Sequence, residues 1–411
     1  MENPKIRFKG FTKDWEQRKL GDYLEVSKEK NRDEGFGKED VLSVSGEFGI
    51  VNQIEFQGRS FAGASVKNYG VVEVFDIVYT KSPLKSNPYG IIKTNKGKAG
   101  IVSTLYAVYK PKNNVDSEFI QIYFELDSRM NSYMHPLVNK GAKNDMKVSD
   151  ENALKGPVIF PRIEEQKMIS QYFSNLDHLI TLHQRKCEQT KKLKKYMLQK
   201  MFPQNGEKVP EIRFDGFTYD WEQRKLNEVA EKICVGFVGT CEKFYTDESG
   251  IPMYRTGNLN GLSLNRDDLK YVTNEFHQHN QKSQLKAGDI LIARHGDSGK
   301  AVNYENSEEA NCLNIVIIRP DFKKCNYKFL TNCINSPECQ KHIKSLSAGS
   351  TQAVINTSEI EKLGVVIPAN IDEQNRIARY FSTLDNLITL HQRKCDELKK
   401  MKKYMLQNMF I

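Results

Sequence analysis

Residues 165–202 read EQKMISQYFSNLDHLITLHQRKCEQTKKLKKYMLQKMF, and residues 373–410 read EQNRIARYFSTLDNLITLHQRKCDELKKMKKYMLQNMF. Aligned without gaps, the two stretches agree at 27 of 38 positions. Neither contains proline or glycine, so each is predicted to form one long helix, about 57 Å in length at ~1.5 Å per residue. A chain that carries the same long helix twice is predicted to consist of two similar halves.

A second repeat lies well upstream of each helix. PKIRFKGFTKDWEQRKL at 4–20 returns as PEIRFDGFTYDWEQRKL at 210–226, with 14 of 17 positions identical. This offset of about 206 residues is far longer than a solenoid repeat, so we predict a duplicated unit made of a domain and a helix. PQNGEKVP at 203–210 contains two prolines and one glycine and marks the boundary between the halves.

Two bodies that differ widely in sequence lie between the repeated segments, at 21–160 and 227–371. Runs rich in β-branched and aromatic residues, bounded by glycine or proline, predict strands in both bodies. The predicted strands lie at 69–80, 90–93, 100–111, 154–161, 252–258, 287–296 and 312–320. Helical patterns lie at 117–130 and at 327–343, where Pro337 is expected to interrupt the second.

Apolar side chains along the second helix recur every three or four residues, close to a heptad pattern. The predicted buried seam consists of Leu384, Ile388, His391, Cys395, Leu398, Met401, Met405 and Met409. Because the two helices present nearly the same face, we predict that they pack against each other, and the intervening body gives the chain room to return antiparallel.

The net charge of +9 is concentrated in the helices. Residues 176–202 hold seven basic against two acidic side chains, and residues 384–410 hold six against three. The two segments therefore carry +5 and +3, which leaves about +1 for the rest of the chain. Any nucleic-acid site in the bodies is expected to be a local patch rather than a domain-wide positive field.

Other features indicate a soluble, cytoplasmic protein. No apolar run approaches the ~20 residues that span a bilayer, and the first residues lack an apolar signal-peptide core. The eight cysteines form no CxxC pair and have no histidine cluster beside them, so we expect reduced, mostly buried thiols and no zinc site.

Catalytic motifs are incomplete wherever they are suggested. HGDSGKA at 295–301 lacks the glycine spacing and the Ser or Thr of a phosphate-binding loop, and SNPYG at 86–90 lacks one proline of an amino-methyltransferase loop. Glu165-Gln166-Lys167 fits a nuclease fragment but has no second carboxylate beside it. We interpret these segments as a loop, a turn and the start of a helix.

Loops rich in Lys, Arg and Asn suggest DNA contacts, because these side chains suit phosphates and the edges of guanine and adenine. The loops lie at 80–100 and 141–151 in the first body, and at 254–268, 293–300 and 348–359 in the second. The alternative is that they are ordinary solvated loops. The candidate residues are Lys81, Lys85, Asn87, Tyr89, Lys93, Lys96, Lys98, Lys143, Asn144, Arg255, Asn258, Asn260, Arg294, His295, Ser298, Lys300, Ser350, Thr351 and Gln352.

The lysine runs KKLKKYM at 191–197 and KKMKKYM at 399–405 have two interpretations. They are either the solvated face of a coiled coil or a surface that contacts the DNA backbone or an acidic partner.

The doubled WEQRKL segment, the doubled proline–EQ–helix segment with its LDxLITLHQRK core, and the loops DIVYTKSPLK and GDILIARHGDSGK resemble the specificity subunit of type I restriction–modification systems. The resemblance covers the whole chain. It implies an α/β fold with two mixed α/β target recognition domains, two long antiparallel coiled-coil helices between them, and an internal pseudo-twofold repeat. We therefore predict recognition domains at 1–163 and 204–371 and spacer helices at 164–203 and 372–411.

The same resemblance implies a noncatalytic subunit in which each domain reads one half of a gapped DNA target. It implies two modification subunits that methylate adenine with AdoMet, and two restriction subunits that use ATP and Mg²⁺, as partners on double-stranded DNA. No cofactor is expected in this chain. The competing hypotheses are a stand-alone methyltransferase or nuclease, and a dimerising helical scaffold that does not bind DNA.

Overall fold

The computed structural model describes residues 3–81, 84, 86–140, 146–259, 263–294, 299–346 and 355–411. The chain divides into two compact units. The first contains residues 1–182 and 394–411, and the second contains residues 183–393. Each unit therefore combines one globular body with parts of both long helices, and the boundaries at 163, 203 and 371 stay a prediction.

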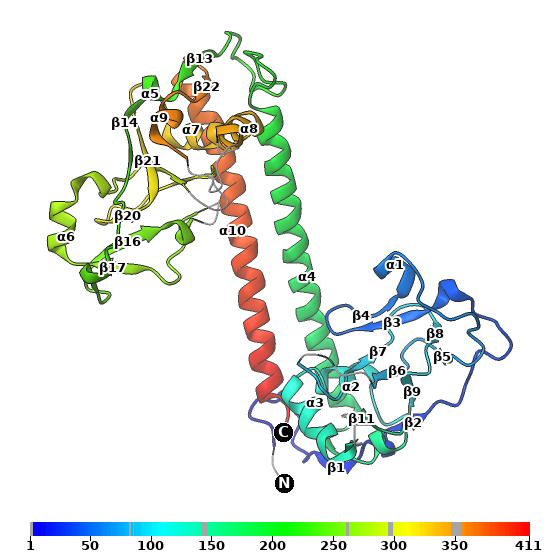
Figure 1. Ribbon diagram of the computed structural model, residues 1–411. Helices are drawn as coiled ribbons and strands as arrows, with labels where there is room; N and C mark the ends of the chain where they lie inside the picture. The colour runs from blue at the N-terminus through cyan, green and yellow to red at the C-terminus, as the bar shows by residue number, and fades with distance from the viewer. Residues whose placement is uncertain are drawn as a thin grey trace. The chain divides into compact units, whose positions relative to one another are not determined.

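The two predicted long helices are confirmed (Figure 1). Helix α4 spans Ile163–Lys200, and helix α10 spans Ile371–Asn408. Both lack the residues that break a helix, and both carry two acidic side chains in the first turn, where the helix dipole favours negative charge.

Contacts within the second unit show that α4 and α10 pack antiparallel. His183 Nδ1 lies 3.0 Å from His391 Nδ1. Farther along α4, Lys194 Nζ lies 2.6 Å from Asp385 Oδ1. Residue numbers that rise along α4 thus meet numbers that fall along α10, which confirms the predicted packing.

The inward face of α10 differs from the predicted seam at one turn. Met401 was predicted to be buried, but it is 48% exposed, so this part of the prediction is wrong. Lys402 points inward instead, with 14% of its side chain exposed. Its ammonium donates to Asp177 and Glu125, each at 2.6 Å, so an ion-pair network replaces an apolar contact here. The predicted positions that are at most 5% exposed are Leu384, Ile388, Cys395 and Met409.

The first unit is built on a four-stranded antiparallel sheet in the order β2-β9-β6-β7, with two-stranded sheets β1-β12, β3-β4, β5-β8 and β10-β11 around it. Its strands are β1 (Glu16–Lys19), β2 (Leu24–Val26), β3 (Leu42–Ser45), β4 (Gly49–Asn52), β5 (Gly70–Val72), β6 (Ile77–Thr80), β7 (Ile92–Thr94), β8 (Gly100–Val102), β9 (Tyr106–Pro111), β10 (Asn139–Lys140), β11 (Met146–Lys147) and β12 (Pro157–Phe160). Its short helices are α1 (Gln53–Gln57), α2 (Ser117–Tyr123) and α3 (Asp127–Met134), with 3₁₀ turns at Leu20–Asp22, Lys38–Asp40, His135–Leu137 and Asn152–Leu154.

Three of the predicted elements of the first unit are split, and one of them is the run at 100–111, which forms β8 and β9. The run at 69–80 forms β5 and β6, because the backbone N–H of Glu73 donates to Asp76 Oδ2 at 2.8 Å and closes a turn between them. Phe75 adopts a left-handed φ of 70° in this turn. The helix predicted at 117–130 is likewise divided into α2 and α3.

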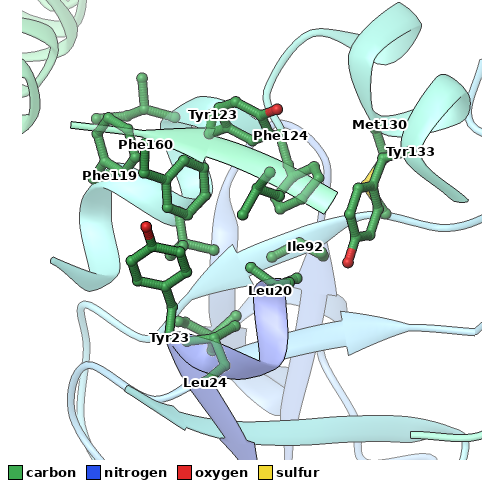
Figure 2. Packing of buried hydrophobic residues seen from close by; sticks show 14 of the residues in the cluster. Leu20, Tyr23, Leu24, Ile92, Phe119, Tyr123, Phe124, Met130, Tyr133 and Phe160 are labelled. Atoms are coloured by element: carbon green, nitrogen blue, oxygen red, sulfur yellow. The ribbon is translucent and has the colours of Figure 1, made fainter. Parts of the chain in front are cut away.

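Aromatic side chains fill the core of the first unit. Figure 2 shows Phe119, Tyr123 and Phe160 packed together, with ring centroids 4.9–6.4 Å apart. Phe410, from the segment after α10, enters the same cluster and lies 6.2 Å from Trp15. The first repeated segment and the end of the second helix therefore complete one core.

The second unit contains the four-stranded sheets β14-β21-β18-β19 and β15-β17-β16-β20 and the pair β13-β22, and only β16 and β20 pair in parallel among these described strands. Its strands are β13 (Glu222–Lys225), β14 (Ala230–Val235), β15 (Tyr245–Thr246), β16 (Ile251–Arg255), β17 (Lys270–Val272), β18 (Ile290–Ala293), β19 (Ala301–Asn303), β20 (Asn311–Leu313), β21 (Ile315–Pro320) and β22 (Gly364–Ile367). Its short helices are α5 (Leu226–Val229), α6 (Asn274–His279), α7 (Tyr327–Ile334), α8 (Pro337–Leu346) and α9 (Thr357–Glu361), with 3₁₀ turns at Glu242–Phe244, Thr256–Asn258 and Gln281–Ser283.

The core of the second unit repeats the plan of the first. Phe202, which follows α4, lies 6.1 Å from Trp221 and 5.6 Å from Phe329. The predicted break at Pro337 is present, because this proline starts α8 and separates it from α7. Mixed helix and strand content, the repeat and the helix pair together confirm the predicted fold class.

Candidate nucleic-acid interface

A buried ion pair ties each repeated N-terminal segment to the start of a long helix. Arg7 donates to both carboxylate oxygens of Glu165, at 2.7 and 2.8 Å. Arg213 makes the same two bonds to Glu373 at the same distances. The glutamates are 2% and 1% exposed, so each is held inside its unit. Glu165, suggested above as a nuclease fragment, is thus occupied by an arginine in the same unit.

The glutamine that follows each glutamate is equally confined. Gln166 Oε1 accepts from the backbone N–H of Asp116 at 2.9 Å, and its amide nitrogen donates to the carbonyl of Pro161, also at 2.9 Å. Gln374 repeats these bonds with Asn326 and Pro368, at 2.8 and 2.9 Å. Both side chains are fully buried. The EQ motif therefore fixes the start of a long helix against the body of its own unit.

The predicted loops of the first body meet directly after strand β6. Lys81, the first residue after that strand, forms an ion pair with Asp150. The phenol of Tyr109 donates to the carbonyl of Asp150 at 3.1 Å. The ion pair joins the loop at 80–100 to the end of the predicted loop at 141–151, and Tyr109 ties the same end to strand β9.

The second body has the same junction after strand β18. Arg294, the first residue after that strand, donates from Nε to the carbonyl of Ile355 at 3.2 Å. The backbone N–H of Ile355 donates in turn to the carbonyl of Arg294 at 3.4 Å. A cationic residue thus holds two distant segments together at the equivalent place in each unit, although the two sequences differ around it.

Several predicted residues of the first loop have internal partners. Asn87 is 6% exposed and donates to Asp127 at 2.6 Å, while its side-chain oxygen has no hydrogen-bond partner. Tyr89 packs edge-on against His135 at 5.9 Å and accepts a bond at its carbonyl from Tyr79. Contact of Asn87 with a base would require it to leave Asp127.

The lysines of the first loop differ in their surroundings. Lys93 in β7 is 8% exposed, and burial lowers the pKa of its ammonium group, against the opposing effect of Glu125. Lys96 lies at the surface 3.2 Å from Glu118, and Lys98 is also exposed. In the present conformation, Lys96 and Lys98 are accessible to a phosphate and Lys93 is largely covered.

Arg255 and Asn258 occupy the base of the predicted loop at 254–268. Asn258 is 2% exposed, and its side-chain oxygen accepts from the backbone N–H of Arg255 at 2.9 Å. Arg255 is partly exposed and pairs with Asp268 at 2.9 Å. Asn258 therefore shapes the loop, and Arg255 presents the charge.

The remaining predicted residues are one exposed lysine and a set that lies outside the described ranges. Lys300 is exposed. The residues outside the described ranges are Lys85, Lys143, Asn144, Asn260, His295, Ser298, Ser350, Thr351 and Gln352. The assignment of all the predicted residues to DNA contact stays a prediction.

Acidic partners of the predicted cations were missed by the sequence interpretation. Asp150, Asp268 and Glu118 each pair with a predicted DNA contact. The near-neutral charge of the bodies indicated that acids lie among the bases, but the residue pattern does not reveal which acid meets which base. A buried example is Arg319, which donates to both oxygens of Asp289 at 2.7 Å.

Three general properties of the described residues bear on the type of site. No three or more His, Cys, Asp or Glu side chains in this part of the chain lie together as metal ligands. All eight cysteines are buried and free, as expected for reduced thiols. None of the helices described has the length and apolar character needed to cross a bilayer.

Comparison with known proteins connects this architecture to one family. The family model described as the type I restriction modification DNA specificity domain matches residues 12–192 and again 219–400. The MjaVIII specificity subunit of a type I restriction enzyme from Methanocaldococcus jannaschii is 24% identical over 319 residues, covering 75% of this chain and 73% of that protein. The putative MjaX specificity subunit of the same organism is 22% identical, covering 96% and 92%.

Solved structures share the fold. The S subunit of a type I restriction–modification system from M. genitalium superimposes with a TM-score of 0.65 at 13% identity, covering 100% of this chain and 99% of that one. A chain from a study of type I complex assembly and conformational transition gives a TM-score of 0.52 at 15% identity, with 97% of both chains covered. With two matches of the family model that span most of its length, the chain belongs to the type I restriction–modification DNA specificity family.

Proposed function

We propose that this specificity subunit reads one half of a bipartite, gapped DNA target with each of its two bodies and performs no chemistry of its own. The observation that supports this most is the loop junction found once in each unit. Lys81 and Arg294 follow equivalent strands, and each joins two distant loops. Two similar frames that carry different loops suit two different half-sites at a fixed spacing.

The chemistry belongs to partner subunits in this proposal. Two modification subunits would methylate adenine with AdoMet, taking the base out of the duplex, and two restriction subunits would use ATP and Mg²⁺. The specificity subunit would bind double-stranded DNA and hold these partners in the cytoplasm. The antiparallel helices α4 and α10 would act as the spacer between the two readers.

Methylome sequencing of cells with and without the gene tests the proposal. We expect loss of N6-methyladenine at a single gapped, asymmetric motif in the cells that lack it. AdoMet-dependent methylation by the isolated chain would contradict the noncatalytic role and favour a stand-alone methyltransferase. An unchanged methylome, with no sequence preference even beside the partner subunits, would favour a helical scaffold without DNA recognition.

A domain exchange and a helix insertion test which part of the chain reads each half-site and which part sets the gap. Replacing residues 21–160 by the corresponding body of another specificity subunit is expected to change one half of the motif and leave the other half intact. Inserting whole helical turns into α4 and α10 is expected to lengthen the gap, if the helices set the spacing. A gap of the original length after such insertions would exclude the spacer role.

A further inference from the structure

The loop between β16 and β17 is closed at its base by Arg255, Asp268 and Lys270. Arg255 Nη2 donates to the backbone carbonyl of Asp268 at 2.7 Å and to its Oδ2 at 2.9 Å. Lys270 Nζ donates to the other carboxylate oxygen at 2.7 Å. One carboxylate therefore neutralises part of the charge of two cations.

Arg255 is held differently from the structural arginines of the chain. Arg7, Arg213 and Arg319 each donate from Nε and Nη2 to a carboxylate that is at most 2% exposed. Within the described part of the chain, Arg255 donates to Asp268 through Nη2 alone, and its Nε is buried without a hydrogen-bond partner there. The side chain of its partner Asp268 is 72% exposed. A guanidinium with half of its planar donor fork unused is suited to an acceptor that can take both bonds.

The backbone around Arg255 is held by Asn258, whereas its guanidinium is held by the partly exposed pair with Asp268. Asn258 Oδ1 accepts from the Arg255 backbone N–H at 2.9 Å, and its amide donates to the carbonyl of Asp267 at 3.1 Å. The guanidinium is held by an ion pair whose carboxylate is 72% exposed, and pairs with an exposed partner contribute little to stability. Asp268 adopts a left-handed φ of 50°, which places this carboxylate at the turn that leads into β17.

We propose that Asp268 is a specificity-determining residue that occupies Arg255 and Lys270 until a matching DNA acceptor replaces it. This inference rests on the proposed function. Nonspecific attraction to DNA grows with each cation that is free to replace a counterion at a phosphate. An internal carboxylate weakens that attraction for every sequence alike. A guanine edge, whose O6 and N7 accept both donors of an arginine, competes with the carboxylate better than a mismatched base does.

The carboxylate of Asp268 remains ionised near neutrality. Hydrogen bonds from Lys270 and then Arg255 lower its pKa below the ordinary value of an aspartate. Asp268 therefore does not have to be protonated before DNA can replace it. Its carboxylate and the DNA acceptor compete for the donors of Arg255 and Lys270.

The test uses the specificity subunit in complex with its modification subunits and two duplexes, one with the motif found by methylome sequencing and one scrambled. We expect Asp268→Asn to raise affinity for the scrambled duplex about three- to tenfold and affinity for the motif less, so that the specificity ratio falls. The slope of log affinity against log salt should steepen by about 1 to 2, since up to two further cations reach phosphates.

Asp247→Asn is the matched control, because it removes the same charge from an exposed turn where the carboxylate accepts from Ser249. It should leave both affinities unchanged. Arg255→Ala should weaken binding to the motif at least tenfold and relax one position of one half-site, while Lys323→Ala, at an exposed lysine after β21, should not.

The outcomes separate the inference from the proposed function. If the wild-type complex prefers a motif but Asp268→Asn behaves like Asp247→Asn, the inference is overturned alone. The same holds if Arg255→Ala binds the motif normally. If the wild-type complex prefers no sequence, the proposed function and the inference fail together. Unchanged thermal melting of the variants shows that an altered ratio does not come from unfolding.

Discussion

The two units share a frame, formed by the repeated segments at 4–20 and 210–226 and the starts of the long helices. They differ in the bodies that this frame holds. Glu165 and Glu373 bind their arginines with the same two distances, and Gln166 and Gln374 repeat the same pattern of bonds. The bodies between these anchors each contain a four-stranded sheet, β2-β9-β6-β7 and β14-β21-β18-β19, and differ in the sheets formed by their other strands. The comparison teaches that the repeated residues hold the helix to the body, which leaves the loops free to diverge.

At some equivalent positions the two units differ in hydrogen bonding or in residue type. Trp221 Nε1 donates to Glu373 at 3.2 Å, whereas Trp15 Nε1 is buried without a partner. In strand register, Lys93 of β7 pairs with Val78, and Val302 of β19 takes the equivalent place opposite Leu291. One unit therefore buries a lysine where the other buries a valine.

The largest effect is expected from removing the frame glutamates. Glu373→Ala leaves Arg213 with an unpaired, largely buried charge, which costs about 3 to 5 kcal/mol. Glu165→Ala should cost less, by about 1 kcal/mol, because Glu373 also accepts from Trp221. Hydrogen exchange followed by mass spectrometry measures each unit separately. Glu222→Ala, at an exposed ion pair, is the control, and equal losses in both units would contradict the asymmetry.

The second-largest effects on stability are expected from replacing the inward-facing lysines of the long helices. Lys402 donates to two carboxylates and Lys194 to one, and both are largely buried. We expect Lys402→Met to weaken the first unit by about 2 kcal/mol and Lys194→Met to weaken the second by about 1 kcal/mol. Protection of amides in the adjacent helix turns reports the difference, and Lys191→Met provides an exposed control. A larger effect at Lys194 would refute the role assigned to the second carboxylate.

Replacing Lys93 is expected to stabilise the first unit. Its pKa is lowered in the fold by burial, so the charged form is disfavoured at neutral pH. Lys93→Met should gain about 1 kcal/mol at pH 7, as for other buried charges replaced by apolar groups. The gain should shrink as pH rises through the lowered pKa toward 10.5, because wild-type Lys93 then loses its charge. Melting curves at several pH values test this, with Lys96→Met as the exposed control.

The smallest difference is expected between the tryptophans. Trp15→Phe and Trp221→Phe remove the same volume from equivalent cores, but only the second breaks a hydrogen bond, that to Glu373. We therefore expect Trp221→Phe to cost about 1 kcal/mol more than Trp15→Phe. Chemical denaturation with unit-specific hydrogen exchange resolves the two, and identical costs would show that the Trp221 bond adds nothing.

The long helices, their packing and the duplicated frame could be predicted because they depend on local pattern and repetition. The exception at Met401 arose because a heptad pattern does not register a lysine that meets two distant acids. The split at 73–76 was missed for a similar reason. Phe75 takes a left-handed conformation without glycine, in a turn that is closed by a bond from the Glu73 N–H to the Asp76 carboxylate.

The candidate site was less accessible to sequence reasoning. The loops were selected by their basic and amide residues, but Asn87 and Asn258 are buried and bonded within the protein. Whether an asparagine faces a base or closes a turn depends on tertiary contacts that composition does not encode. The acids that restrain the cations, such as Asp268, depend on the same contacts.

The ends of the two long helices determine the order in which the protein can mature during translation. Leu406, Met409 and Phe410 belong to the core of the first unit, and they are synthesised after every residue of the second unit. Domains generally fold as units as they leave the ribosome, amino-terminal ones first. Here the second unit, at residues 183–393, has all its parts earlier. Of the two units, the first begins to be translated earlier, but its core is completed later than that of the second.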